Sequence, residues 1–117
     1  MLTEIDITEL KIGYATIAVN EVAAIEKDYD YGEFDSTKKT ITINKELNQT
    51  DKINTLVHEI FHAILWERGV ADSGGILDQK EKEEENIVNC LGNGFVQLIQ
   101  DNPQIISVLN LLHKQRK

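Results

Sequence analysis

The chain has 117 residues, of which 41% are hydrophobic and 27% charged, and we expect a single globular domain over residues 1–117. The net charge of −8 and the scarcity of clustered lysine and arginine argue against direct nucleic-acid binding. No apolar run is long enough to span a membrane, and no signal peptide is recognisable at the start. The lone cysteine, Cys90, suits a reducing cytoplasm and is expected to be a small core residue.

The first half of the chain carries strand patterns. Residues 10–20 are rich in β-branched and aromatic side chains around Gly13 and predict a first strand. Residues 31–35 and 40–44 alternate in polarity on either side of a short polar turn, which predicts a β-hairpin. The stretch 21–30 between these segments fits a short helical turn or a loop equally well.

From Asp51 onward the apolar positions follow a helical period. An apolar stripe runs from Ile53 to Ile64 at the spacing of one helix face. Thr50 or Asp51 can accept the free N–H groups at the start of this helix, and Gly69 suits its end.

Two more helices are expected after a polar loop over residues 70–79. The second runs over 79–100 and stops before Pro103, which cannot continue a helix. A shorter third helix over 104–113 is rich in aliphatic residues and is expected to cover the core.

The first predicted helix contains the motif His58-Glu59-Ile60-Phe61-His62. Positions i and i+4 lie one above the other on a helix, so His58 and His62 can offer two nitrogens to one cation. Glu59 lies beside that axis, where a carboxylate can accept a proton from an activated water. Both histidines border the apolar stripe, so the helix can pack into the core and present them to an inner cavity. The alternative is a pair of helical histidines that make core hydrogen bonds beside an exposed Glu59.

Two histidines are too few for a catalytic zinc, which typically has three protein ligands and one open position. On a helical wheel Glu84 lies at the centre of the second helix's apolar stripe, where a buried carboxylate needs a charged partner such as a metal. Glu84 is therefore the predicted third ligand, and Glu85, at the flank, is the reserve ligand or a carboxylate that orients a histidine. Alternatively, Glu84 belongs to a solvated, charged first helical turn. The weaker candidates are His113, Asp72, Asp78, Glu81 and Glu83.

Two imidazoles and one carboxylate suit zinc first, with manganese, iron or nickel as alternatives. Such a site favours metal-assisted amide hydrolysis, in which Glu59 takes a proton from water and passes it to the leaving amine. An oxyanion donor is also needed, and the sequence does not choose among Tyr29, Tyr31 and Lys80. The first strand of the predicted hairpin, if it is an edge strand, can bind an extended peptide. Gly32 there permits close backbone approach, or else forms a bulge or turn.

These residues resemble the ImmA/IrrE-type metallopeptidases. The resemblance rests on a β-hairpin, then the segment 55–64 with its HExxH motif, then a glutamate-bearing helix. More narrowly, residues 84–94, Glu-Glu-Asn-Ile-Val-Asn-Cys-Leu-Gly-Asn-Gly, followed by Asp-Asn-Pro at 101–103, are similar to the compact phage and prophage versions. The resemblance covers residues 10–103.

The resemblance implies an α+β fold, with an N-terminal three-stranded antiparallel sheet packed on the active-site helix. It also implies a gluzincin-type zinc site of His58, His62 and a glutamate, with Glu59 as general base. The implied partner is a protein substrate, often a helix-turn-helix repressor of a mobile element. The expected place of action is the cytoplasm, which is the host cytoplasm if the protein is encoded by a phage. The alternative is a catalytically silent, metal-stabilised binding protein of the same fold. A purely structural metal site of this kind would not need Glu59. A DNA-associated protease of the SprT kind is disfavoured because it needs a basic surface.

Overall fold

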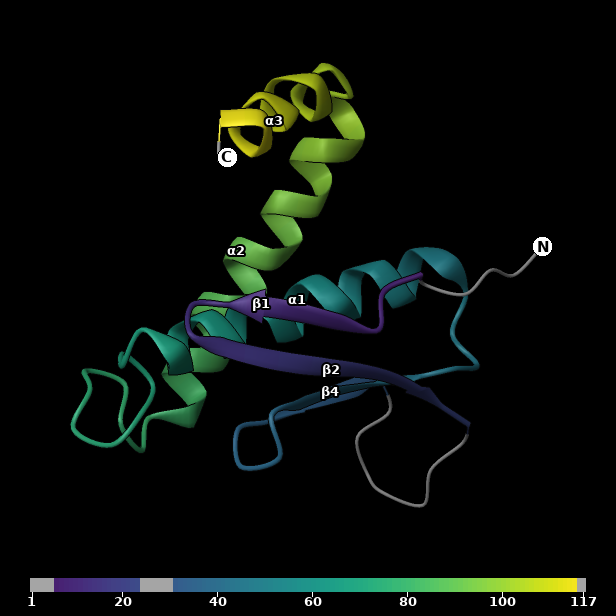
Figure 1. The fold of residues 1–117 in the computed structure, drawn as a ribbon. Coiled ribbons are helices and arrows are strands. Elements are labelled where there is room, and N and C mark those ends of the chain that lie inside the picture. Colours follow the sequence, from purple (N-terminus) through teal and green to yellow (C-terminus); the bar gives the residue numbers. More distant parts are fainter. Residues whose placement is uncertain (1–5, 24–30, 116–117) are drawn as a thin grey trace.

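The computed structural model describes residues 6–23 and 31–115, which form one four-stranded sheet and three helices (Figure 1). The strands are β1 (Glu9–Ile12), β2 (Ala15–Val22), β3 (Gly32–Asp35) and β4 (Thr40–Asn44). The helices are α1 (Gln49–Glu67), α2 (Glu81–Asp101) and α3 (Gln104–Gln115). α1 lies along one face of the sheet, while α2 runs away from this layer and carries α3 at its far end (Figure 1). The expected α+β class is confirmed.

The strand order is β1-β2-β4-β3, with β2 and β4 parallel and both outer pairs antiparallel. The expected three-stranded antiparallel sheet is therefore wrong in strand number and in direction. The single strand predicted over 10–20 is two strands, because Gly13 adopts a φ of 61° and turns the chain between β1 and β2. The predicted hairpin is confirmed as β3 and β4. β4 lies between β2 and β3, and its Ile41 and Ile43 are both fully buried.

One face of the sheet packs against α1 to form the core. The buried core residues are Ile12, Ile17, Val19, Ile41 and Ile43 of the sheet and Leu56 and Ala63 of α1. A buried ion pair also joins the two layers, since Lys52 Nζ lies 2.6 Å from Glu21 Oε1 and Lys52 is 1% exposed. Because a buried ammonium requires a charged partner, this pair fixes the start of α1 over the end of β2.

Both ends of α1 are held by specific contacts. The cap is Asn48, not the predicted Thr50 or Asp51, since its side chain accepts a hydrogen bond of 2.8 Å from the backbone N–H of Asp51. The predicted Gly69 follows the other end with a φ of 81°. Near that end Glu67 accepts a hydrogen bond of 3.2 Å from the backbone N–H of Tyr14. The turn between β1 and β2 is thereby joined to the last turn of α1.

α2 begins and ends within two residues of its prediction, and residues 70–79, all of them described, form neither helix nor strand. The expectation that the third helix covers the core is wrong, because none of the described residues of α3 is buried. Cys90 is also exposed, against expectation. α2 faces α1 through the buried Val88 and Gly92, and Cys90 lies about 200° around the helix from each of them. No helix in the described part of the chain is long and apolar enough to cross a membrane.

Candidate metal and active site

His58 and His62 point the same way from α1, one turn apart. Their Nε2 atoms lie 3.2 Å from each other, and the two rings meet edge to face with centroids 4.8 Å apart. Both side chains are largely buried, with 21% and 15% of their surfaces exposed. The spacing of four residues in a helix therefore brings two imidazole nitrogens to one place, as the motif predicts.

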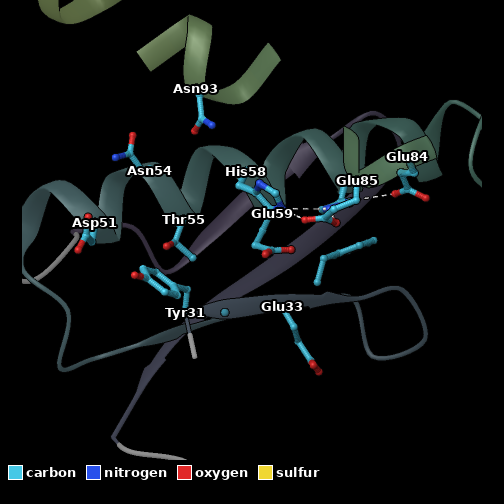
Figure 2. A pocket seen from close by; sticks show the side chains of 13 residues that line it. Tyr31, Glu33, Asp51, Asn54, Thr55, His58, Glu59, Glu84, Glu85 and Asn93 are labelled. Carbon is cyan, nitrogen blue, oxygen red and sulfur yellow. Dashed lines mark hydrogen bonds and ion pairs between the residues drawn. The ribbon is translucent and has the colours of Figure 1, made fainter. Parts of the chain in front are cut away.

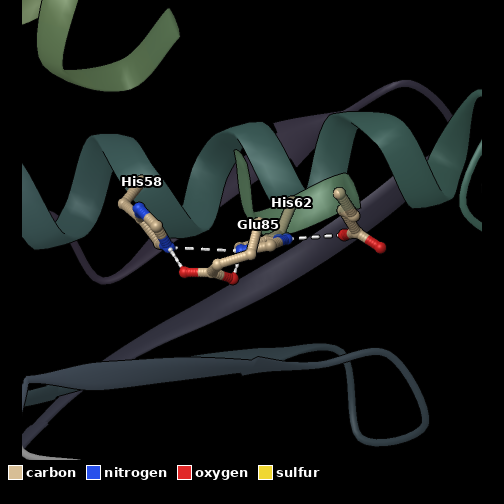
Figure 3. A network of polar contacts seen from close by, with 4 residues as sticks. His58, His62 and Glu85 are labelled. Carbon is tan, nitrogen blue, oxygen red and sulfur yellow. Dashed lines mark hydrogen bonds and ion pairs between the residues drawn. The ribbon is translucent and has the colours of Figure 1, made fainter. Parts of the chain in front are cut away.

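Glu85 completes this cluster from the first turns of α2. Its two carboxylate oxygens lie 2.9 Å from His58 Nε2 and 3.1 Å from His62 Nε2 (Figure 3). Ligand atoms of the three residues all lie within 4.8 Å of one another, close enough for one metal ion. The packing of α2 on α1 thus adds one carboxylate to the pair of imidazoles.

Glu84 lies behind His62. Its Oε2 is 2.5 Å from His62 Nδ1, whereas Glu85 approaches Nε2 of the same ring. The side chain is 18% exposed, so Glu84 faces α1 as the helical wheel indicates. The helical wheel predicts Glu84 as the third ligand, with Glu85 in reserve. In the structure Glu85 instead reaches the Nε2 atoms of both histidines, whereas Glu84 contacts only Nδ1 of His62. A wheel gives the angle around α2 but not how the two helices cross.

The contact with Glu84 fixes the proton on the His62 ring. A carboxylate accepts hydrogen bonds, so in the neutral imidazole Nδ1 carries the hydrogen and Nε2 carries the lone pair. That lone pair faces the carboxylate of Glu85, which is also an acceptor. Two acceptors at 3.1 Å require a proton or a cation between them. A carboxylate behind the ring is the usual means of orienting a histidine ligand.

Burial also favours a neutral His58. Desolvation lowers the pKa of His58, and the charge of His62 acts in the same direction, while the carboxylate of Glu85 opposes them. A neutral imidazole has the free lone pair that a metal requires, whereas an imidazolium has none. His58 is therefore suited to bind a cation near neutral pH.

Glu59 lies beneath the two histidines and is 7% exposed, so the alternative with an exposed Glu59 is wrong. Burial raises its pKa from 4.5 to about 7, and the charges of Glu85 and Glu33 add to the rise. The charge of His62 and a hydrogen bond from the backbone N–H of Phe34 partly oppose it. A carboxyl group with this pKa can both accept and donate a proton near neutral pH.

A cavity of about 670 Å³ opens between α1, β3 and α2, and the cluster lies in its wall (Figure 2). Its lining residues are Tyr31, Gly32, Glu33, Phe34, Asp51, Asn54, Thr55, His58, Glu59, His62, Glu84, Glu85 and Asn93. Among the described residues, the weaker candidate ligands lie outside this lining: Asp72, Asp78, Glu81, Glu83 and His113. Of the candidate oxyanion donors Tyr31 lines the cavity, Lys80 does not, and Tyr29 lies outside the described residues.

Sequence reasoning missed several polar lining residues. Asn54 precedes His58 by four residues and so shares its helix face, a signal that the periodicity already contained. Asn93 follows Glu85 by eight residues, about two turns later on α2. Glu33 could not have been found, because its place near Glu59 depends on how β3 packs against α1.

β3 forms an edge of the sheet beside Glu59. The backbone N–H of Asn44 donates to the carbonyl of Tyr31 at 2.8 Å, and this ladder alternates between bonded and non-bonded pairs. Gly32 and Phe34 therefore turn their backbone groups away from β4, and the N–H of Phe34 does reach Glu59. Gly32 is part of the regular strand, and its role is close approach, since a Cβ there would lie 2.9 Å from Thr55 Cγ2 of α1.

The geometry agrees with the comparison with known protein families. The family model Peptidase_M78, described as the IrrE N-terminal-like domain, matches residues 13–94. Neither a curated protein nor a solved structure matches the chain. The matched segment runs from the turn after β1 to the middle of α2 and so includes HExxH, Glu84 and Glu85. Because the match covers well over half of the sequence, the chain belongs to the Peptidase_M78 family, the ImmA/IrrE-like metallopeptidases.

Proposed function

We propose that this protein is a zinc-dependent metallopeptidase that hydrolyses a peptide bond in a protein substrate. In this proposal His58, His62 and Glu85 hold the zinc, and Glu59 is the general base. The observation that carries it is the convergence of three ligand groups within 4.8 Å of one another, beside a buried carboxyl group whose pKa is about 7. Glu84 then orients His62. The sequence alone predicts this orienting role for Glu85, as the alternative to a role as reserve ligand.

The donor set supports zinc as the metal. Two imidazole nitrogens and one carboxylate are a usual set for a catalytic zinc, which keeps a further position for substrate or water. The lone pair of His62 Nε2 faces the carboxylate of Glu85, and a dication between them would satisfy both acceptors. When bound, zinc supplies a Lewis acid for the scissile carbonyl and lowers the pKa of water. Manganese, iron or nickel remain alternative metals for these ligands.

The residues around the metal site have separate roles in the proposed reaction. The ionised Glu59 accepts a proton from the attacking water, and the resulting carboxylic acid donates it to the leaving amine nitrogen. The backbone N–H of Phe34 holds the Glu59 carboxylate in place at the edge of β3. Glu84 keeps the hydrogen of His62 on Nδ1 and its lone pair directed at the metal site.

The edge of β3 supports a peptide as the substrate. Gly32 turns its N–H and C=O outward in the cavity wall, where an extended peptide can pair with them as an added strand. The same edge brings the peptide next to Glu59. We further propose, from the family resemblance, that the substrate is a regulatory protein such as a helix-turn-helix repressor of a phage or other mobile element. The lone cysteine favours the cytoplasm as the place of action.

The proposal is tested by the variant Glu59→Gln in zinc-loaded protein. A mixture of unstructured peptides is incubated with each protein, and new ends are identified by mass spectrometry. Wild type should cleave peptides that the variant leaves intact, while both contain equal zinc by elemental analysis. If the wild type holds zinc but cleaves nothing, the catalytically silent binding protein replaces this proposal. Loss of zinc from the variant would show that Glu59 is a ligand and not the base.

A further inference from the structure

The wall of the active-site cavity carries an excess of negative charge. Five of its lining residues are carboxylates, and among the described residues that line it none is lysine or arginine. A dication in the cluster would be offset by Glu85 and Glu59. Glu33, Asp51 and Glu84 then remain, so the wall stays anionic with the metal in place. Such a concave surface attracts cations and repels anions.

Two of these carboxylates are not needed to hold the metal. Glu33 lies in β3 between Gly32 and Phe34, and its side chain projects from the side of the strand away from α1 (Figure 2). It is exposed, yet its charge is felt at Glu59. A peptide paired with β3 would place a side chain about 5 Å from that of Glu33, the usual separation of cross-strand neighbours. Glu33 is thus placed to contact a residue close to the scissile bond.

Asp51 lies at the other end of the cavity from Glu84, with Glu59 between them (Figure 2). It precedes His58 by seven residues, which is about 10 Å along the axis of α1. An extended peptide covers that length in about three residues. One oxygen of Asp51 accepts a weak hydrogen bond from Asn48 at 3.3 Å.

We propose that this cavity selects peptide segments with a lysine or arginine within about three residues of the scissile bond, with Glu33 as the main specificity-determining residue and Asp51 as the second. The inference rests on the proposed function for the identity of the cleaved bond. It is carried by two observations together: backbone groups of an edge strand that can pair with a peptide, and two carboxylates placed along the path of that peptide. Opposite charges across such a pair stabilise binding, and like charges oppose it.

Binding of designed peptides tests the inference separately from hydrolysis. Three fluorescently labelled peptides are identical except at two positions that flank a central alanine-leucine pair, which hold lysine, glutamine or glutamate. Their anisotropy is measured with zinc-loaded Glu59→Gln protein, alone and combined with Glu33→Gln. The matched control adds Glu9→Gln, which removes the same charge from the exposed outer face of β1 at the opposite edge of the sheet.

The lysine peptide should bind most tightly and the glutamate peptide least. Glu33→Gln should lower the lysine-over-glutamate preference by about fivefold, the size expected for one exposed charge pair, and Glu9→Gln should leave it unchanged. High salt should weaken the preference in all proteins that show it. Equal binding of the three peptides, no binding of any, or an equal loss in both variants would overturn the inference.

Wild-type activity on the same peptides distinguishes the two proposals. Cleavage of all three at equal rates would overturn the charge selection and leave the peptidase function standing. A lysine preference in binding without any cleavage by zinc-loaded wild type would retain the selection and overturn the peptidase function. Cleavage of the lysine peptide first, with a preference that falls in Glu33→Gln, supports both.

Discussion

Burial of Glu59 makes the stability of the metal-free protein depend on pH in a defined direction. Its folded-state pKa of about 7 lies above the unfolded value of 4.5, so the folded state favours the protonated carboxyl. The stability that this preference contributes is complete below pH 4.5 and is lost as the pH rises through 7. One pKa unit corresponds to 1.36 kcal/mol, so the loss approaches about 3 kcal/mol by pH 8.

The test compares wild type with Glu59→Gln after removal of metal by a chelator. Urea unfolding followed by circular dichroism gives the free energy of unfolding at pH 5 and pH 8. Relative to the variant, the free energy of unfolding of wild type should fall by about 2 to 3 kcal/mol between pH 5 and pH 8, which corresponds to roughly 10 °C in melting temperature. Zinc should suppress the loss in wild type, because a bound cation favours the ionised carboxylate.

A control variant separates Glu59 from the general effect of removing a negative charge. Glu9→Gln changes an exposed carboxylate of β1, and its pH profile should run parallel to that of wild type. Parallel profiles for wild type and Glu59→Gln in the metal-free state would refute the reasoning. They would mean that Glu59 ionises as freely in the folded protein as in the unfolded chain.

Two further substitutions test how α1 is held over the sheet. Gly32→Ala should lower the free energy of unfolding by about 1 to 3 kcal/mol, since its Cβ would lie 2.5 Å from the carbonyl oxygen of Thr42 and 2.9 Å from Thr55 Cγ2. A loss below about 0.5 kcal/mol in urea unfolding would show that α1 does not approach β3 this closely. Lys52→Met should destabilise by about 3 to 5 kcal/mol, because it removes the ammonium group that lies 2.6 Å from the carboxylate of Glu21 between the two layers. Adding Glu21→Gln should restore part of that stability, and a double variant no more stable than Lys52→Met would contradict the role of the ion pair.

The features that the sequence predicts well are local ones. His58 and His62 share a helix face because they are four residues apart, whatever the rest of the chain does. The β3–β4 hairpin is also local, with two alternating segments joined by a short turn. Gly69 at the end of α1 belongs to the same class, since a helix end requires a residue that tolerates positive φ.

The features that the sequence does not predict depend on distant contacts. The parallel pairing of β2 with β4 joins segments more than twenty residues apart, and no pattern within either strand specifies its direction. The roles of Glu84 and Glu85 depend on the crossing of two helices, which sets whether a carboxylate reaches the inner or the outer nitrogen of His62. Glu33 and Asp51 share the cavity only because β3 packs beside α1.

The central claim is that His58, His62 and Glu85 hold zinc while Glu84 orients His62. Its most direct test is the zinc affinity of wild type, Glu85→Gln and Glu84→Gln, measured by competition with a chromophoric chelator. Wild type should bind one zinc ion per chain. Glu84→Gln should weaken binding by about 10- to 100-fold, as expected for a residue that orients a ligand, and Glu85→Gln should weaken it considerably more. Wild-type affinity in Glu85→Gln together with loss of zinc from Glu84→Gln would contradict the claim.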